Sequence, residues 1–190
     1  MKVHPVIRAS IFFILIIFLG SKVAENKTGL DVAAAKLATH GIAVPDLLKP
    51  VKVWTQGEAT LSAILENPEA KVVYLEASLN YDIAFPTALG FMLMTLLFAV
   101  PVTAWPARLQ KESRFIVLAL GAFVIGFDFS ENGSILEYLN SGGSAILLVC
   151  FQITSTLKWT FLAITNLTIL VLYLRWGRER MMKNWPIAAM

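Results

Sequence analysis

Residues 115–136 read FIVLALGAFVIGFDFSENGSIL, an apolar run that carries two carboxylates toward its far end. A helix that crosses a bilayer needs about 20 mostly apolar residues, so this run predicts a membrane span. An ionised side chain at mid-bilayer costs about 2.5–3.5 kcal/mol on insertion scales. Asp128 and Glu131 therefore need partners, water or a function, and they mark the candidate site as well as the fold class.

The composition of the whole chain agrees with a membrane protein. Of the 190 residues, 57% are apolar and 15% are charged, against roughly 45–50% and about 25% in soluble domains. A soluble monomer of this composition would expose large apolar patches, so lipid is the expected solvent. Cys150 is the single cysteine, which excludes an intrachain disulfide and a cysteine zinc cluster. No phosphate-loop, dinucleotide or HExxH motif occurs, so no metal or cofactor is expected.

Three more apolar stretches accompany the first, over residues 9–21, 79–100 and 145–176. The predicted fold is therefore an all-α polytopic membrane protein with four transmembrane helices and a short helical extracytoplasmic segment. The stretch 9–21 fits either a signal anchor or a cleaved signal peptide, which would leave three spans. Lys22 stands where a cleavage site favours a small residue, and this favours an uncleaved anchor.

Lysine and arginine predict the orientation of the spans. They occur in residues 1–8, 101–114 and 175–190, whereas residues 133–144 contain none. Both termini are thus expected in the cytoplasm, with residues 22–78 and 133–144 outside. The predicted organisation is an anchor over 1–21, an extracytoplasmic segment over 22–78, a membrane bundle over 79–176 and a basic tail over 177–190. The basic charge then faces anionic headgroups, so no nucleic-acid partner is expected.

The segment 22–78 is too short and too thinly apolar for a core of its own. Leu30–Thr39 predicts a short amphipathic helix that ends before Gly41. A second helix is expected over 59–66. Pro68 suits the first turn of a third helix, which can run without interruption into the next membrane span. We therefore expect this segment to cap the bundle.

Four ionisable residues are expected in one layer of the outer leaflet. At 1.5 Å per residue, Asp82, Asp128, Glu131 and Lys158 lie about 20–27 Å from the cytoplasmic ends of their helices. Glu137 lies farther out and is expected in solvent.

The helical periodicity orients these side chains. Asp128, Glu131 and Asn132 are spaced i, i+3, i+4 and share one face. Thr154, Lys158 and Thr165 form a stripe on the last span, which we expect to face the carboxylates. Pro86, four residues after Asp82, removes a backbone hydrogen bond and is a candidate hinge.

Three carboxylates beside one lysine would carry a net charge of minus two if all were ionised. In a poorly hydrated site this predicts that a carboxyl holds a proton or that a cation binds. The alternative is a structural role, in which the cluster joins the helices through a buried salt bridge.

Three short motifs resemble a group of small, mostly uncharacterised bacterial inner-membrane proteins: Asp82-x-x-Phe85-Pro86, Phe127-Asp128-x-x-Glu131-Asn132 and Thr156-Leu157-Lys158-Trp159. The similarity covers roughly residues 55–176. It implies four membrane helices, a bacterial inner-membrane location and a polar cluster that acts as a unit, but no activity. The lack of an organelle address agrees with that location.

Three functions follow from these features. An accessory or ligand/ion-binding membrane protein is favoured, with the lipid bilayer and either a larger membrane complex or a homo-oligomer as partners. A proton- or ion-coupled transporter component is second, since no inverted repeat is evident. An enzyme using intramembrane carboxylates is third, because no nucleophile–base pair is visible.

Overall fold

The computed structural model describes residues 5–45, 49–82 and 84–184, and within these ranges the chain is helical with no strand. This confirms the predicted all-α class. Lys2 and the end of the predicted basic tail, residues 185–190, lie outside the described residues. The elements are α1 Pro5–Thr39, α2 Pro50–Glu66, α3 Pro68–Ala77, the π-helical turn η2 Ser78–Asp82, α4 Ala84–Ala99, the 3₁₀ turns η3 Val102–Ala104 and η4 Ala107–Leu109, α5 Ser113–Ser141, and α6 Ala145–Asn184.

Three of the helical segments are long and apolar enough to cross a membrane: Pro68–Ala99, Ser113–Ser141 and Ala145–Met181. They contain the last three of the four stretches that the sequence predicts as spans. The first stretch, residues 9–21, lies instead in the N-terminal part of α1, which is 35 residues long. The predicted short helix Leu30–Thr39 is only the last part of α1. No proline interrupts residues 6–39, so nothing forces a break.

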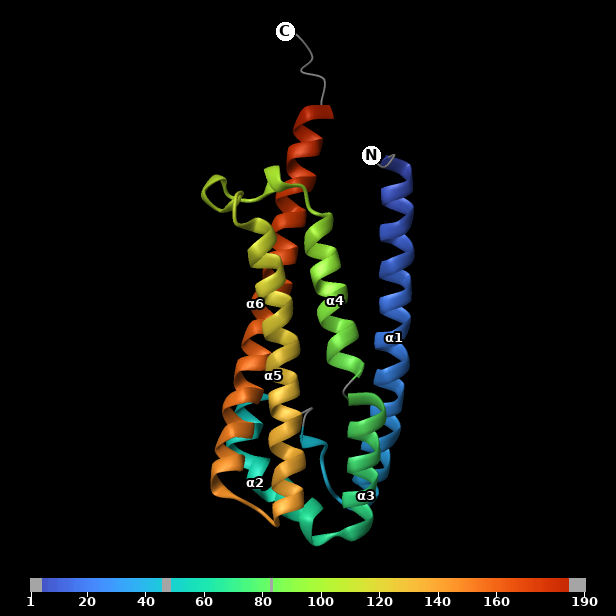
Figure 1. Cartoon of the computed structure of the whole chain (residues 1–190), viewed down its shortest axis with the longest axis vertical. Helices are drawn as coiled ribbons and strands as arrows, with labels where there is room; N and C mark the ends of the chain where they lie inside the picture. Colours follow the sequence, from blue (N-terminus) through green and yellow to red (C-terminus); the bar gives the residue numbers. More distant parts are fainter. Residues whose placement is uncertain (1–4, 46–48, 83, 185–190) are drawn as a thin grey trace.

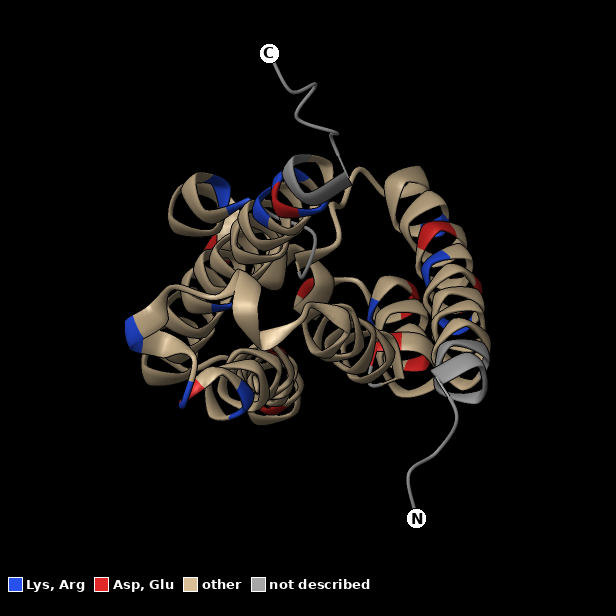
Figure 2. Ribbon diagram, turned by 90° about the horizontal axis from the view of Figure 1, so that it is seen from above, with Lys and Arg blue, Asp and Glu red and all other residues tan. Residues whose placement is uncertain are grey.

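The long helices run side by side, and the connections gather at two ends (Figure 1). One end holds η3, η4, the start of α5 and the end of α6. Residues 105–114 and 175–184, which belong to this end, contain arginine and lysine. The other end holds α2, α3 and the turn between α5 and α6. Seen along the bundle from the end that holds η3 and η4, many of the charged residues lie toward its outside (Figure 2).

The α5–α6 hairpin has the most extensive helix packing in the structure. Its turn uses two glycines in the left-handed region, Gly142 at φ 78° and Gly143 at φ 98°. The Gly143 amide donates to the carbonyl of Tyr138 over 3.0 Å, which closes the end of α5. Because the turn is short, the two helices are antiparallel neighbours along their length.

The segment 22–78 shares a hydrophobic core with the membrane helices. Leu37 of α1, Leu61 of α2 and Tyr74 of α3 are buried against side chains of α5 and α6. α2 is longer than the predicted helix 59–66, and its Gly57 lies against α6: a Cβ there would come within 2.9 Å of the Phe151 ring.

A second close approach joins α4 to α5. A Cβ on Gly90 would meet the Ile125 side chain, and one on Gly121 would meet the Met94 side chain. Because glycine has no side chain, these two positions let the backbones of α4 and α5 come close, as small residues do in membrane bundles. This contact positions α4 beside the polar face of α5.

The predicted helix from Pro68 toward the membrane is helical throughout its described residues, as α3, the π-helical turn η2 and α4, and residue 83 between η2 and α4 lies outside them. Asn67 caps α3, since its Oδ1 accepts from the Ala70 amide over 3.1 Å, and Pro68 stands in the first turn as expected. The wide turn η2 carries Asp82, and Pro86 follows in the first turn of α4. π-helical turns and prolines are the usual causes of a bend in a helix. The stretch from Ser78 to Pro86 contains one of each, η2 and Pro86.

Candidate functional site

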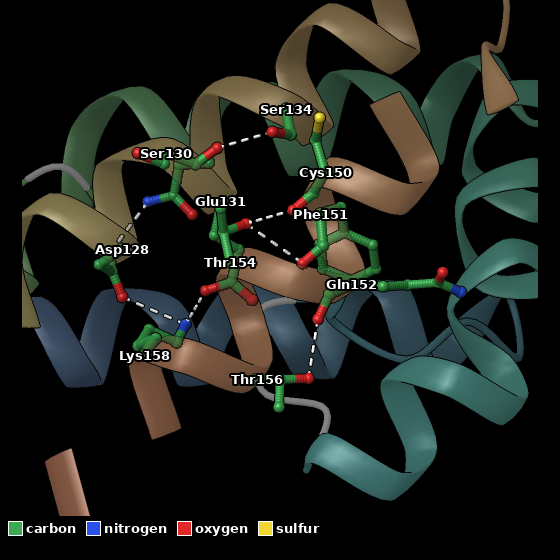
Figure 3. A network of polar contacts seen from close by, with 11 residues as sticks. Asp128, Ser130, Glu131, Ser134, Cys150, Phe151, Gln152, Thr154, Thr156 and Lys158 are labelled. Atoms are coloured by element: carbon green, nitrogen blue, oxygen red, sulfur yellow. Dashed lines mark hydrogen bonds and ion pairs between the residues drawn. The ribbon is translucent and has the colours of Figure 1, made fainter. Parts of the chain in front are cut away.

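Lys158 of α6 bridges the two carboxylates of α5 (Figure 3). Its Nζ lies 3.1 Å from Asp128 Oδ1, and it also forms an ion pair with Glu131. The side chains of Lys158 and Asp128 are 10% and 9% exposed, and that of Glu131 is fully buried. The ammonium and the two carboxylates are thus shielded from solvent. Removing one of these charges would leave a buried charge without its partner, which is costly.

Asn132 completes the polar face of α5. Its Nδ2 donates to Asp128 Oδ2 over 3.2 Å, one turn back along the helix. The amide therefore holds the carboxylate whose other oxygen faces Lys158. Of the three residues that share this helix face, Asp128 and Glu131 pair with Lys158 of α6, and Asn132 holds Asp128.

The side chains of Asp82, Asp128 and Lys158 line a cavity of about 150 Å³. Asp82 reaches it from η2 and is itself buried. The rest of the wall is apolar and comes from α1, α4, α5 and α6: Leu30, Phe85, Pro86, Leu89, Val124, Trp159 and Leu162. Charged residues from η2, α5 and α6 thus line one cavity whose remaining wall is apolar.

Three polar atoms in this layer are buried without a hydrogen-bond partner in the described chain: Ser78 Oγ, Asn132 Oδ1 and Ser155 Oγ. Each belongs to a residue within one helical turn of a charged member of the cluster. Ser78 precedes Asp82 by four residues and Ser155 precedes Lys158 by three. Buried polar atoms are nearly always satisfied, so this layer has hydrogen-bonding capacity beyond its internal contacts.

The structure brings the five sequence-predicted residues into one region. Glu131 and Asn132 contact the other members but do not line the cavity, whereas Pro86 does. Glu137 is exposed, as expected. On α6, Thr165 is fully buried, but Thr154 is half-buried and donates to the carbonyls of its own helix at Cys150 and Phe151 (Figure 3).

Sequence reasoning missed Ser78, Ser155 and the apolar wall of the cavity. Ser155 is fully buried beside Lys158, and the stripe Ser155, Lys158, Thr165 has a spacing that fits one helical face. The sequence predicts a separate short helix for Leu30, whereas the long helix α1 places Leu30 in the wall of the cavity. A short separate helix did not predict this contact.

The charges of the cluster do not balance if all its carboxyls are ionised. Asp128 and Glu131 share one ammonium, that of Lys158, and Asp82 lines the same cavity; among the described residues, Lys158 is the basic residue in its wall. Within the described residues, no three His, Cys, Asp or Glu side chains form a group suited to a metal ion. The arrangement is therefore chemically able to hold a proton or a cation that needs few oxygen ligands.

Comparison of the chain with models of protein families, with curated proteins and with solved structures finds no match, so the interpretation of this site depends on its own geometry.

Proposed function

We propose that this chain is a small integral membrane protein of the bacterial inner membrane that binds a proton or a cationic ligand in the cluster of Asp82, Asp128, Glu131, Asn132 and Lys158. Both termini face the cytoplasm, and residues 22–78 cap the outer end of the bundle. The N-terminal half of α1 is the first of four membrane passes. Its exposed large side chains favour a lipid environment: Ile11, Phe13, Ile14, Leu15, Ile17 and Phe18.

The observation that carries the proposal is the cavity onto which Asp82, Asp128 and Lys158 open. A cluster that only joined helices would be expected to close tightly around its ion pairs, because every buried charge needs full satisfaction. Here two carboxylates and an ammonium line a cavity, and the nearby hydroxyls of Ser78 and Ser155 have no hydrogen-bond partner among the described residues. These features support a site that binds a proton or a cationic ligand.

The basic residues support the orientation. Arg108, Arg114, Arg175 and Arg180 belong to η4, the start of α5 and the end of α6, and these segments lie at the same end of the bundle (Figure 1). Positive charge flanking membrane helices on one side favours a cytoplasmic location for that side. The polar cluster then lies in the outer half of the membrane.

Native mass spectrometry of protein purified gently in a mild detergent tests the proposal. We expect the parent chain to carry a bound small cation or molecule that Asp82→Asn abolishes. Glu137→Gln removes the same charge from an exposed site on α5 and is the matched control. Constant co-purification with a larger complex, with no change in Asp82→Asn, would instead favour an accessory role with a structural cluster.

A further inference from the structure

A groove lies where α4 ends and α5 begins, toward the other end of the bundle from the polar cluster. Its volume is about 440 Å³. Its walls come from the end of α4, from the connection that follows and from the first two turns of α5. Arg114 in this groove and Asp128 in the cluster are 14 residues apart on α5, which corresponds to about 21 Å along the helix. The groove is therefore separate from the candidate site described above.

Most of the groove is apolar. Eight of the ten residues that line it are aliphatic or aromatic, and the other two are Ser113 and Arg114. Phe98 and Val102 in its wall are exposed although both are large and apolar, and so is Phe115 beside it in the sequence. Exposed apolar surface of this kind marks contact with a membrane or a partner. The groove is therefore suited to hydrocarbon.

The charge at the groove is positive. Among the described residues that line it, Arg114 alone is charged, and its side chain is exposed. None of the ion pairs between described side chains involves Arg114. The turn before α5 adds Arg108 and Lys111 against one carboxylate, that of Glu112. A ligand that complements this end of the groove is therefore an anion.

The start of α5 favours an anion at the same place. Ser113 and Arg114 are the first two residues of this helix, and both line the groove. The N-cap residue, Glu112, forms no capping hydrogen bond with its side chain. The first amides of a helix have no acceptor within it, and they attract phosphate oxygens. A guanidinium adds two parallel hydrogen bonds to such oxygens.

We infer that this groove binds an anionic phospholipid, with the phosphate at Arg114 and the first turn of α5 and an acyl chain against Phe98 and Val102. The apolar wall favours a lipid over a free phosphate, which would leave that wall uncovered. Trp105 in the same wall suits the level of the headgroups, where tryptophan is common. In the proposed orientation the lipid belongs to the cytoplasmic leaflet. The inference goes beyond the proposed function, because it assigns a second site.

Native mass spectrometry of the full chain in detergent tests this inference with two added lipids. Dioleoyl phosphatidylglycerol is anionic, whereas dioleoyl phosphatidylethanolamine has the same acyl chains and no net charge. We expect the first phosphatidylglycerol to bind at least about fivefold more tightly, which is the attraction of roughly one basic residue for anionic lipid at a membrane surface. Inorganic phosphate is the third probe, and it should not displace the lipid.

Three variants locate the lipid. Arg114→Gln should remove most of the preference for phosphatidylglycerol. Arg178→Gln is the matched control, since it removes the same charge from an exposed position near the end of α6 that does not line the groove. Ala99→Leu narrows the groove and keeps every charge, so it should weaken the binding of both lipids. Melting temperatures establish that each variant is folded.

Equal affinity for the two lipids in the parent chain would overturn the inference. Equal losses in Arg114→Gln and Arg178→Gln would also overturn it, because the preference would then belong to the whole basic end of the bundle. Displacement of the lipid by inorganic phosphate, or lipid binding that Ala99→Leu leaves unchanged, would show that the groove holds no acyl chain. Asp82→Asn should leave the lipid preference intact, so failure of this inference is distinguishable from failure of the proposed function.

Discussion

Nζ of Lys158 in α6 lies 3.1 Å from Oδ1 of Asp128 in α5, and both side chains are at most a tenth exposed. A buried charge that loses its partner is far more costly than one at the surface. The charge state of this pair is therefore coupled to the packing of the α5–α6 hairpin. Any ligand that alters the charge of the cluster acts on the same contact.

Lys158→Met should destabilise the protein by about 3–5 kcal/mol, because it leaves two carboxylates buried without their cation. Replacing all three charges, as Asp128→Asn with Glu131→Gln and Lys158→Met, should restore most of this stability. Denaturant unfolding in mixed micelles measures both. Lys27→Met, which removes an exposed ion pair with Asp31, is the control and should change little. A triple variant no more stable than Lys158→Met would argue against this coupling.

Much of the site was predictable because helical periodicity is strict. The i, i+3, i+4 spacing of Asp128, Glu131 and Asn132 places them on one face whatever the packing. The choice between Thr154 and Ser155 as the buried neighbour of Lys158 was not predictable. Adjacent residues differ by about 100° around a helix, and only the neighbouring helices determine which of them faces inward.

Gly90→Ala should destabilise the α4–α5 contact by about 1–3 kcal/mol, as overpacking commonly does. Its Cβ would meet the Ile125 side chain and lie 3.4 Å from the Gly121 carbonyl oxygen. Gly126→Ala is the matched control on α5, because its Cβ would have nothing within 4 Å. There the better helix propensity of alanine should give up to about 1 kcal/mol of stability. Thermal unfolding compares the two, and equal effects would refute the close approach.

Trp54 connects α2 to α6, since its Nε1 donates to Thr156 Oγ1 over 3.0 Å. A double-mutant cycle with Trp54→Phe and Thr156→Val should give a coupling of about 0.5–1.5 kcal/mol, the usual net value of such a bond. Additive effects of the two substitutions would show that this hydrogen bond does not hold α2 on α6.

Cys150 provides a test of orientation, as it is the single cysteine and is exposed on α6. It lies eight residues, or about 12 Å, beyond Lys158 toward the predicted outer surface. A membrane-impermeant maleimide should therefore label Cys150 in intact spheroplasts. The variant Cys150→Ser with Arg108→Cys should be labelled only after permeabilisation. The reverse pattern would invert the proposed topology.

The three helical segments that are long and apolar enough to cross a membrane could be predicted, because length and hydropathy are local properties of a sequence. The π-helical turn at Ser78–Asp82, the close pairing of Gly90 with α5 and the reach of α1 to the cavity were not foreseen. Each of these depends on which helices become neighbours. The apolar side of the candidate site was missed for the same reason, because its wall is assembled from four helices.

The central claim is that the cluster cannot remain fully ionised without a bound cation. Infrared spectroscopy of the protein at pH 7, exchanged into a buffer whose cations are too large for the cavity, tests it most directly. We expect the carbonyl band of a protonated carboxyl, diminished by Asp82→Asn, Asp128→Asn or Glu131→Gln and unchanged by Glu137→Gln. Absence of this band in the parent chain, with the protein folded and free of ligand, would contradict the account.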